Sequence, residues 1–129
     1  MDLKDVTRIS ASGLKAQSLR MRVIAENLAN SDSVASTAGG TPYRRKLVTF
    51  QAGADGVKIG GVTADRSDFP RVYQPGSPAA DAQGYVLQPN VNTLVEGADM
   101  KAAQRSYEAN LNMIDAAKSM TARTIDLLK

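Results

Sequence analysis

The feature that most constrains the fold is the confinement of helix-breaking residues to the middle of the chain. All five prolines lie between Pro42 and Pro89, and eight of the ten glycines lie between Gly39 and Gly84. Glycine and proline interrupt regular structure more strongly than other residues, and both ends of the chain are nearly free of them. The 129-residue sequence therefore predicts a helix at each end and an irregular, strand-containing middle.

The first helix is expected to run from about Leu3 to Ala29. Apolar and small residues recur along it at spacings of three and four, the period of one helix face. They form two adjacent stripes, which are Leu14, Gln17, Met21, Ile24 and Leu28, and Val6, Ile9, Gly13, Ala16, Arg20 and Val23. Asp2 and Asp5 place negative charge in the opening turn, where it favours the helix dipole. Asn30 is expected to end the helix in the left-handed conformation.

The last helix is expected from about Asn92 or Thr93 to Leu128. Glycine costs about 1 kcal/mol inside a helix, so a break or a late start is expected at Gly97. Two stripes again alternate spacings of three and four, as in a coiled-coil-like seam. They are Val95, Ala98, Ala102, Ser106, Ala109, Met113, Ala116, Met120 and Leu127, and Met100, Ala103, Tyr107, Leu111, Ile114, Ala117, Ile125 and Leu128. One antiparallel helix pair can bury only one stripe on each helix, which indicates a subunit of a larger assembly.

The middle segment is expected to contain short strands and turns. Strands are predicted at 43–51 and 85–87, and a hairpin over 57–63 with Gly60-Gly61 at its turn, because glycine supplies positive φ. The small, polar residues 31–41 predict a flexible loop. The predicted fold class is mainly α with a small β part: long N- and C-terminal helices pair as a coiled-coil-like core, joined by a short-stranded, loop-rich middle. The core comprises residues 1–30 and 92–129, and the middle segment comprises residues 31–91.

The composition disfavours an enzyme. The chain has neither cysteine nor histidine, so thiolate and imidazole metal ligands and a Ser-His-Asp triad are excluded. Asp65 and Asp68 form a carboxylate pair, but they lack the spacing of a calcium loop, and we interpret them as solvated loop acids. We therefore expect no catalytic residue, no cofactor and no metal.

The charge pattern also limits the partners. The formal net charge is +3, and the only basic run is Arg44-Arg45-Lys46, which has no surrounding array of stacking aromatics. A solvated strand face or a protein partner is therefore preferred over nucleic acid. The longest apolar run has three residues, against about 20 for a membrane-spanning helix, so no membrane insertion is expected. The first 30 residues contain eight charges and no apolar signal region, so no cleaved signal peptide is expected.

Several helix residues are candidates for a subunit interface. The apolar candidates are Leu14, Met21, Ile24 and Leu28 on the first helix and Met113, Ile114, Met120 and Leu127 on the last. The other candidates are Asn27, Asn30, Arg105, Tyr107 and Asn110. A buried amide must be paired, so it often fixes the register of a helix contact. The alternative is that Asn30 is a helix cap and that the other four are exposed.

Two groups of motifs carry a family resemblance. The run 11–17 (ASGLKAQ) with 27–30 (NLAN) resembles the N-terminal helix of the flagellar axial proteins, which are rod, hook and hook-associated subunits. The run 105–110 (RSYEAN), continuing into 115–120 (DAAKSM), resembles their C-terminal helix. The segments 42–45 (PYRR), 84–86 (GYV) and 89–91 (PNV) resemble a proximal rod subunit in particular.

This resemblance implies a structural, non-enzymatic subunit of the flagellar proximal rod, which transmits motor torque. Its terminal helices would pack around the axis of a helical tube. Its partners would be other rod proteins, copies of itself, and the membrane-ring and export-gate end of the basal body. It would lie in the periplasm after export without a cleaved signal peptide. The alternatives are a second type of proximal rod subunit and a soluble helical binding module of the export system.

Overall fold

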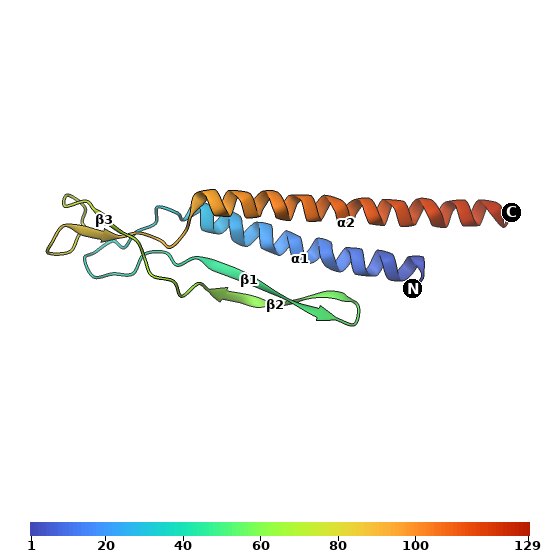
Figure 1. Ribbon diagram of the computed structural model, residues 1–129, viewed down its shortest axis with the longest axis horizontal. Helices are drawn as coiled ribbons and strands as arrows, with labels where there is room; N and C mark the ends of the chain where they lie inside the picture. The colour runs from blue at the N-terminus through green and yellow to red at the C-terminus, as the bar shows by residue number, and fades with distance from the viewer.

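Two long helices run side by side along most of the molecule (Figure 1). We describe them from a computed structural model of residues 1–129. α1 spans Leu3–Ala29 and α2 spans Thr93–Leu127, and they are antiparallel, so both chain ends lie at the same end of the molecule. Four short strands complete the fold. The predicted fold class, mainly α with a small β part, is confirmed.

Side chains at the helix starts explain why both helices begin where they do. The Asp5 N–H donates to Asp2 Oδ1 at 2.9 Å and the Asp2 N–H donates to Asp5 Oδ2 at 3.1 Å, a reciprocal capping box. At α2, Asn92 Oδ1 accepts from the N–H groups of Leu94 and Val95 at 3.1 and 3.3 Å. These side chains satisfy backbone donors that the first turn of a helix leaves unpaired.

Two expectations about the helices are wrong. α2 runs without a break through Gly97, because its cap and its packing against α1 outweigh the modest cost of one glycine. Asn30 does not adopt the left-handed conformation, since its φ is −106°. Its side chain instead donates to the Glu26 carbonyl at 2.9 Å, which satisfies one of the carbonyls at the end of α1.

A two-stranded hairpin lies along α1 on the side away from α2 (Figure 1). Its strands are β1, Lys46–Gly53, and β2, Gly56–Ala64. The turn is therefore at residues 54–55, and the expectation that Gly60-Gly61 forms it is wrong. Gly56 supplies the positive φ at the turn, at +114°, while Gly60 and Gly61 lie inside β2 opposite a register shift between Thr49 and Phe50.

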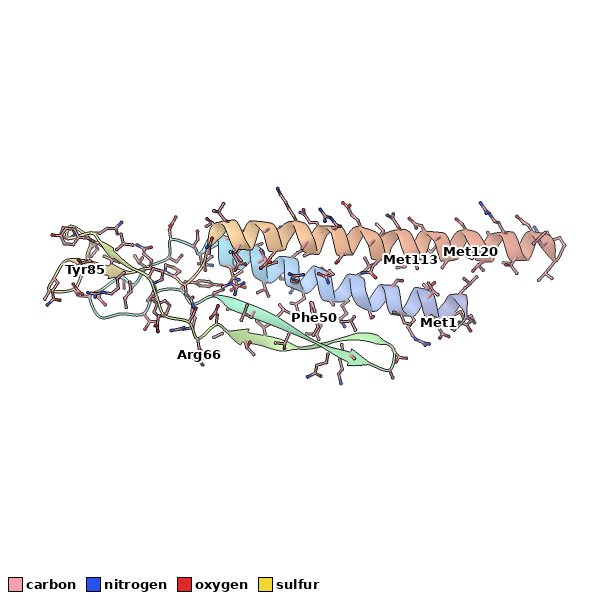
Figure 2. The ribbon with its side chains drawn as sticks, viewed as in Figure 1. Met1, Phe50, Arg66, Tyr85, Met113 and Met120 are labelled. Atoms are coloured by element: carbon pink, nitrogen blue, oxygen red, sulfur yellow. The ribbon has the colours of Figure 1, made fainter.

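The hairpin and α2 together cover the second stripe of α1, in which Gly13 contacts α2 and Ile9 and Ala16 face the hairpin. Ser12 Oγ accepts from the Val57 N–H at 3.0 Å, and Phe50 of β1 lines a shared cavity with Ile9 and Ala16 of α1 (Figure 2). Ala16 is buried on this face. The expectation that both helices need another chain to cover a second stripe is thus wrong for α1, whose second face is occupied by the chain's own hairpin.

A second, smaller sheet forms the end of the molecule opposite the chain termini (Figure 1). β3, Arg71–Tyr73, pairs antiparallel with β4, Tyr85–Leu87. The predicted strand at 85–87 is confirmed, whereas the pattern did not indicate β3. Val86 is fully buried between the sheet and its loops, but few other residues are. Only 14 of the 129 residues are buried, and they are spread along the long axis, so the molecule has no single central core.

Candidate functional site

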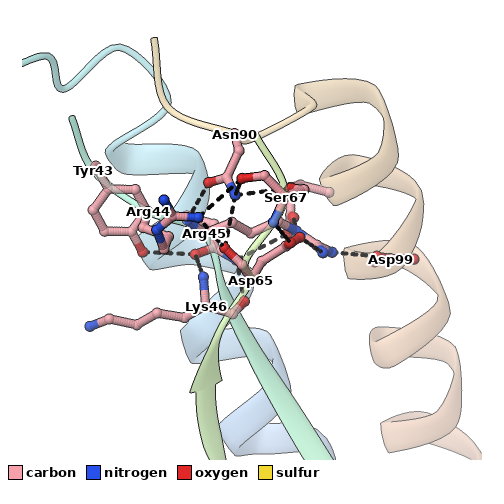
Figure 3. Close-up of polar contacts among 10 residues, drawn as sticks. Tyr43, Arg44, Arg45, Lys46, Asp65, Ser67, Asn90 and Asp99 are labelled. Carbon is pink, nitrogen blue, oxygen red and sulfur yellow. Dashed lines mark hydrogen bonds and ion pairs between the residues drawn. The ribbon is translucent and has the colours of Figure 1, made fainter. Parts of the chain in front are cut away.

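A cluster of polar side chains joins the hairpin to the two helices (Figure 3). At its centre Asn27 of α1 is 1% exposed. Its Nδ2 donates to the Lys46 carbonyl at 2.9 Å and to Glu96 Oε2 at 3.4 Å. Its Oδ1 accepts from the Tyr43 hydroxyl at 2.7 Å and from the Lys46 N–H at 2.9 Å. One amide thus connects α1, α2 and the start of β1.

An arginine and a buried glutamate form the charged part of this cluster. Glu96, in the first turn of α2, is completely buried, and Arg45 Nε pairs with its Oε1. The same guanidinium reaches Asp65 Oδ2 at 3.1 Å and Asp99 Oδ2 at 3.6 Å. Burial opposes the charge on Arg45, but its pairing with Glu96 and Asp65 outweighs that effect and raises the pKa of Arg45. Arg45 therefore stays charged and compensates the buried carboxylate.

The end of β2 is held in the same place. Asp65 Oδ1 accepts the Ser67 N–H at 2.9 Å, and this bond, together with Arg45, lowers the pKa of Asp65. Asn90 Oδ1 accepts the Arg45 N–H at 2.7 Å, and its Nδ2 donates to the Asp65 carbonyl at 3.0 Å. We call the residues that share these bonds the junction cluster: Asn27, Tyr43, Arg45, Asp65, Asn90, Glu96 and Asp99. The interpretation of Asp65 as a solvated loop acid is wrong, whereas Asp68 is exposed.

The basic run is engaged within the chain. Arg44 lies over the Phe69 ring, 4.2 Å from its centroid, and donates to the Asp65 and Ser67 carbonyls. Lys46 pairs with Glu26 at 2.6 Å. The three cations therefore tie the base of the hairpin to α1, α2 and the following loop, in place of the solvated face or external partner that the sequence suggested.

The two stripes of α2 have different environments. Ala103 and Ala117 are buried, so the stripe that contains them faces α1. The other stripe is uncovered, with Val95 48%, Met113 52% and Met120 55% exposed (Figure 2). We call it the α2 stripe, and its exposed residues are Val95, Ala98, Ala102, Ala109, Met113, Ala116, Met120 and Leu127. Contiguous apolar surface of this kind on a helix marks an interaction site.

The predicted interface residues fall into three groups. Ile24 and Asn27 are buried within the chain. Half-buried residues of α1 and α2 form the second group: Leu14, Met21, Leu28, Asn30, Tyr107, Asn110 and Ile114. Exposed residues form the third group: Arg105, Met113, Met120 and Leu127. The structure thus brings Asn27 into the junction cluster and leaves Met113, Met120 and Leu127 free on the α2 stripe.

Sequence reasoning missed Arg45, Glu96 and the role of Gly13. A Cβ on Gly13 would lie 2.7 Å from Asn110 Nδ2, so this glycine permits a close crossing of α1 and α2. Gly13 was detectable, because a glycine inside an otherwise apolar helical stripe indicates close packing. The pair Arg45 and Glu96 gave no local signal, because its members are 51 residues apart.

The structure holds no group of three or more acidic, histidine or cysteine side chains close enough to bind a metal ion. Neither helix combines the length and apolar character that crossing a membrane requires. The largest cavity, about 600 Å³, lies between the hairpin turn and the Ser12–Lys15 region of α1.

Comparison with known proteins assigns a family to this architecture. The family described as "Flagella basal body rod protein" matches residues 8–35, and "Flagellar basal body rod FlgEFG protein C-terminal" matches residues 82–127. The flagellar basal-body rod protein FlgC of Agrobacterium fabrum is 48% identical, over 98% of this chain and 96% of that protein. FlgC of Salmonella typhimurium is 43% identical over 98% of both chains, and FlgC of Bacillus subtilis is 39% identical over 94% and 95%.

Proposed function

The chain belongs to the FlgC family of flagellar basal-body rod proteins and is a structural subunit of the proximal rod; we propose that it builds this rod chiefly through the α2 stripe. The observation that carries the proposal is the uncovered state of that stripe. α1 is flanked by α2 and the hairpin, whereas α2 packs on α1 and, in its first turns, pairs with Arg45 of the junction cluster, which leaves the α2 stripe uncovered. In a family that assembles, the free apolar face is the surface that neighbouring subunits can bury.

The neighbours on this surface would be copies of the chain and other rod proteins. Met113, Met120 and Leu127 supply large apolar side chains, and the alanines between them allow another helix to approach closely. Burial of apolar surface contributes about 25 cal/mol per Å², so a stripe along a 35-residue helix is a substantial source of assembly energy. Contacts repeated in this way would transmit torque along the rod.

The junction cluster would keep each subunit rigid under this load. Its ion pairs and hydrogen bonds link the hairpin, both helices and the 65–67 loop, so a force on one element passes to the others. We propose that the chain has no catalytic role, because Asp65, one member of the Asp65 and Asp68 carboxylate pair, is engaged with Arg45 and Ser67.

The proposed location is the periplasmic part of the basal body, next to its membrane-ring and export-gate end. This part of the proposal, and export without a cleaved signal peptide, rest on the resemblance to axial proteins. The family itself places the chain in the basal body.

Replacing Met120 with Asp tests the α2 stripe. The residue is 55% exposed, so we expect the isolated Met120→Asp variant to keep the thermal stability of the wild type. In the rod, the new carboxylate would be buried without a partner at a cost of several kcal/mol, and swimming should stop. The measurement is motility and basal-body yield in cells whose own copy is replaced by the variant.

The matched control is Ser119→Asp, which adds the same charge at the neighbouring exposed position outside the stripe. We expect cells with this variant to swim. Full motility with both Met120→Asp and the companion variant Met113→Asp would contradict the role of the stripe. Ile24→Asp is unsuitable for this purpose, because Ile24 is buried inside the chain and its loss would unfold the subunit itself.

A further inference from the structure

The side of α1 that points away from α2 is basic. Gly13 lies at the contact with α2, and the residues on the opposite side of the helix follow one another at spacings of three and four. All of them are exposed, and none is acidic. We call them the basic face: Lys4, Arg8, Ala11, Lys15, Ser18, Arg22, Ala25 and Ala29. Small residues separate the cations, so another helix can approach closely between the long side chains.

The side of α2 that points away from α1 is acidic along its C-terminal half. Ala103 and Ala117 are buried against α1, and the opposite side carries exposed carboxylates. We call this side the acidic face: Glu108, Asn112, Asp115, Ser119, Ala122 and Asp126. Towards the start of α2 the same side continues with Arg105 and Lys101, so the acidic face begins at Glu108. The α2 stripe is a separate surface on the flank of the helix between the acidic face and α1.

Most charges of these two faces are unpaired within the chain. No ion pair is formed by Lys4, Lys15, Arg22, Glu108 or Asp115. Arg8 pairs with Asp5 and Asp55, and Asp126 pairs with Lys129 at 3.8 Å. The junction cluster differs, since its charges compensate one another inside the chain. The two outer faces therefore present opposite charges that only another molecule can pair.

We propose that the acidic face of one copy of the chain packs against the basic face of the next copy. α1 and α2 lie side by side (Figure 1), and each face points away from the other helix, so the two faces cannot meet within one chain. The contact repeats from copy to copy and places the helix pairs in a row, with each α1 beside the α2 of a neighbour. This inference rests on the proposed function, because such a row forms only if the chain assembles with copies of itself.

The positions of the charges select one register for this contact. An antiparallel arrangement brings three pairs of opposite charge together at once, which are Lys15 with Asp115, Arg22 with Glu108 and Lys4 with Asp126. All three pairs form in the same register because the cations are separated by the same intervals, seven and eleven residues, as the carboxylates. Arg105 and Lys101 then lie opposite Ala25 and Ala29, so neither cation meets a like charge.

Other registers are less favourable. A shift of one heptad in one direction places Arg22 opposite Lys101, and a shift in the other direction leaves only Arg22 paired, with Asp115. Exposed ion pairs contribute little energy individually, but complementary charges select a partner and like charges oppose a contact. The charges therefore fix the orientation and register of neighbouring copies. Because the two faces differ, the contact is heterologous and propagates beyond a dimer.

Charge reversal tests the contact in cells whose own copy is replaced by the variant. Lys15→Glu and Asp115→Lys each turn an attraction into a repulsion, so each should lower basal-body yield and swimming several-fold. The double variant Lys15→Glu/Asp115→Lys restores an opposite-charge pair and should swim nearly as well as the wild type. Both positions are exposed, so the isolated variants should keep the thermal stability of the wild type. Rescue requires both faces to belong to copies of this chain. A double variant no better than the singles would overturn the proposal, including the case in which another protein covers either face.

The matched control is Lys15→Glu/Asp68→Lys. Asp68 is an exposed acid that lies outside both faces. This variant has the net charge of the wild type but no restored pair, so it should be as defective as Lys15→Glu alone. Equal rescue by Asp68→Lys and Asp115→Lys would mean that only the net charge matters, and it would also overturn the proposal.

Cysteine crosslinking measures the register directly, because the chain has no native cysteine. Ala11 and Ser119 lie opposite each other in the proposed register, and a disulfide requires two Cα atoms within about 7 Å. After mild oxidation of isolated basal bodies, Ala11→Cys/Ser119→Cys should give a ladder of dimers and larger multimers that collapses on reduction. Ala11→Cys/Asn112→Cys places the second thiol about 10 Å away along the same face and should crosslink several-fold less.

The outcomes separate this contact from the proposed function. Ala11→Cys alone and Ser119→Cys alone should stay monomeric. Basal bodies that contain Ala11→Cys/Ser119→Cys but give no ladder, or equal crosslinking by the two cysteine pairs, would overturn the proposed contact. The presence of the wild-type chain in basal bodies and the motility of the Met120→Asp variant test the proposed function independently, so the two failures are distinguishable.

Discussion

At the scale of single residues, the most consequential side chain is Asn27. Its amide makes four hydrogen bonds to three segments, and no other side chain of similar size could replace both its donors and its acceptor. We expect Asn27→Leu to lower the free energy of unfolding by about 3 kcal/mol, because the Lys46 backbone groups would be left buried and unpaired. Urea unfolding followed by circular dichroism measures this change.

The control for this prediction is Asn30→Leu. Asn30 is half-buried, and its Nδ2 donates only to Glu26 of its own helix, so the loss should be about 1 kcal/mol. Similar losses in the two variants would show that the junction cluster does not depend on Asn27. The sequence left open whether Asn27 is a buried amide that fixes a helix register or an exposed polar residue, and the structure buries it within the chain. The adjoining pair of Arg45 and Glu96 could not be predicted, because long-range pairing leaves no periodic signal.

At the scale of elements, the crossing of α1 and α2 depends on Gly13. A Cβ at this position would lie 2.7–2.8 Å from three atoms of the Asn110 side chain, whereas a Cβ on Gly97 would contact nothing within 4 Å. We expect Gly13→Ala to destabilise the isolated chain by about 1–3 kcal/mol through overpacking. Gly97→Ala, the matched control in α2, should stabilise it by about 1 kcal/mol because glycine disfavours a helix.

The measurement is thermal unfolding of both variants and of the double variant Gly13→Ala/Asn110→Ala. Truncation of Asn110 removes the obstructing carboxamide, so the double variant should be more stable than Gly13→Ala. Equal melting temperatures for Gly13→Ala and Gly97→Ala would contradict a close crossing at Gly13.

The elements also differ in how far the sequence specified them. Both helices begin within a residue or two of their predicted starts, because the acidic residues at 2 and 5 and Asn92 form caps that act locally. The hairpin turn was predicted at the wrong place because the segment contains glycine at two possible turns, Gly56 and Gly60-Gly61. The Asp55-Gly56 pair, a strong hairpin signal, was present in the sequence and marks the observed turn. β3 has three residues and pairs with β4 across a loop, so no pattern could reveal it.

At the scale of the whole molecule, the structure is long and has little buried interior. Stability in such a molecule is local: Ala103 and Ala117 in the middle of α2 are buried, whereas Ile125, Leu127 and Leu128 at its end are 53%, 86% and 82% exposed. Local stability of this kind appears as different opening free energies along one chain. The tip of α2, residues 122–128, is therefore expected to be one of the least stable segments of the isolated subunit.

This arrangement predicts the pattern of hydrogen exchange before and after assembly. In the isolated chain, amides of residues 103–117 should exchange slowly, and those of residues 122–128 should exchange at rates close to those of an unfolded peptide. In basal bodies, residues 122–128 should slow by at least about tenfold, since each 1.4 kcal/mol of added opening free energy changes the rate about tenfold. Mass spectrometry of the two samples makes the comparison, with the Ala103–Ala117 segment as the internal reference.

Slow amide exchange of residues 122–128 in the isolated chain would mean that the tip of α2 is stable without neighbours. Unchanged rates in the basal body would mean that neighbours leave the tip of α2 uncovered, and the interface of the α2 stripe would then end before Leu127.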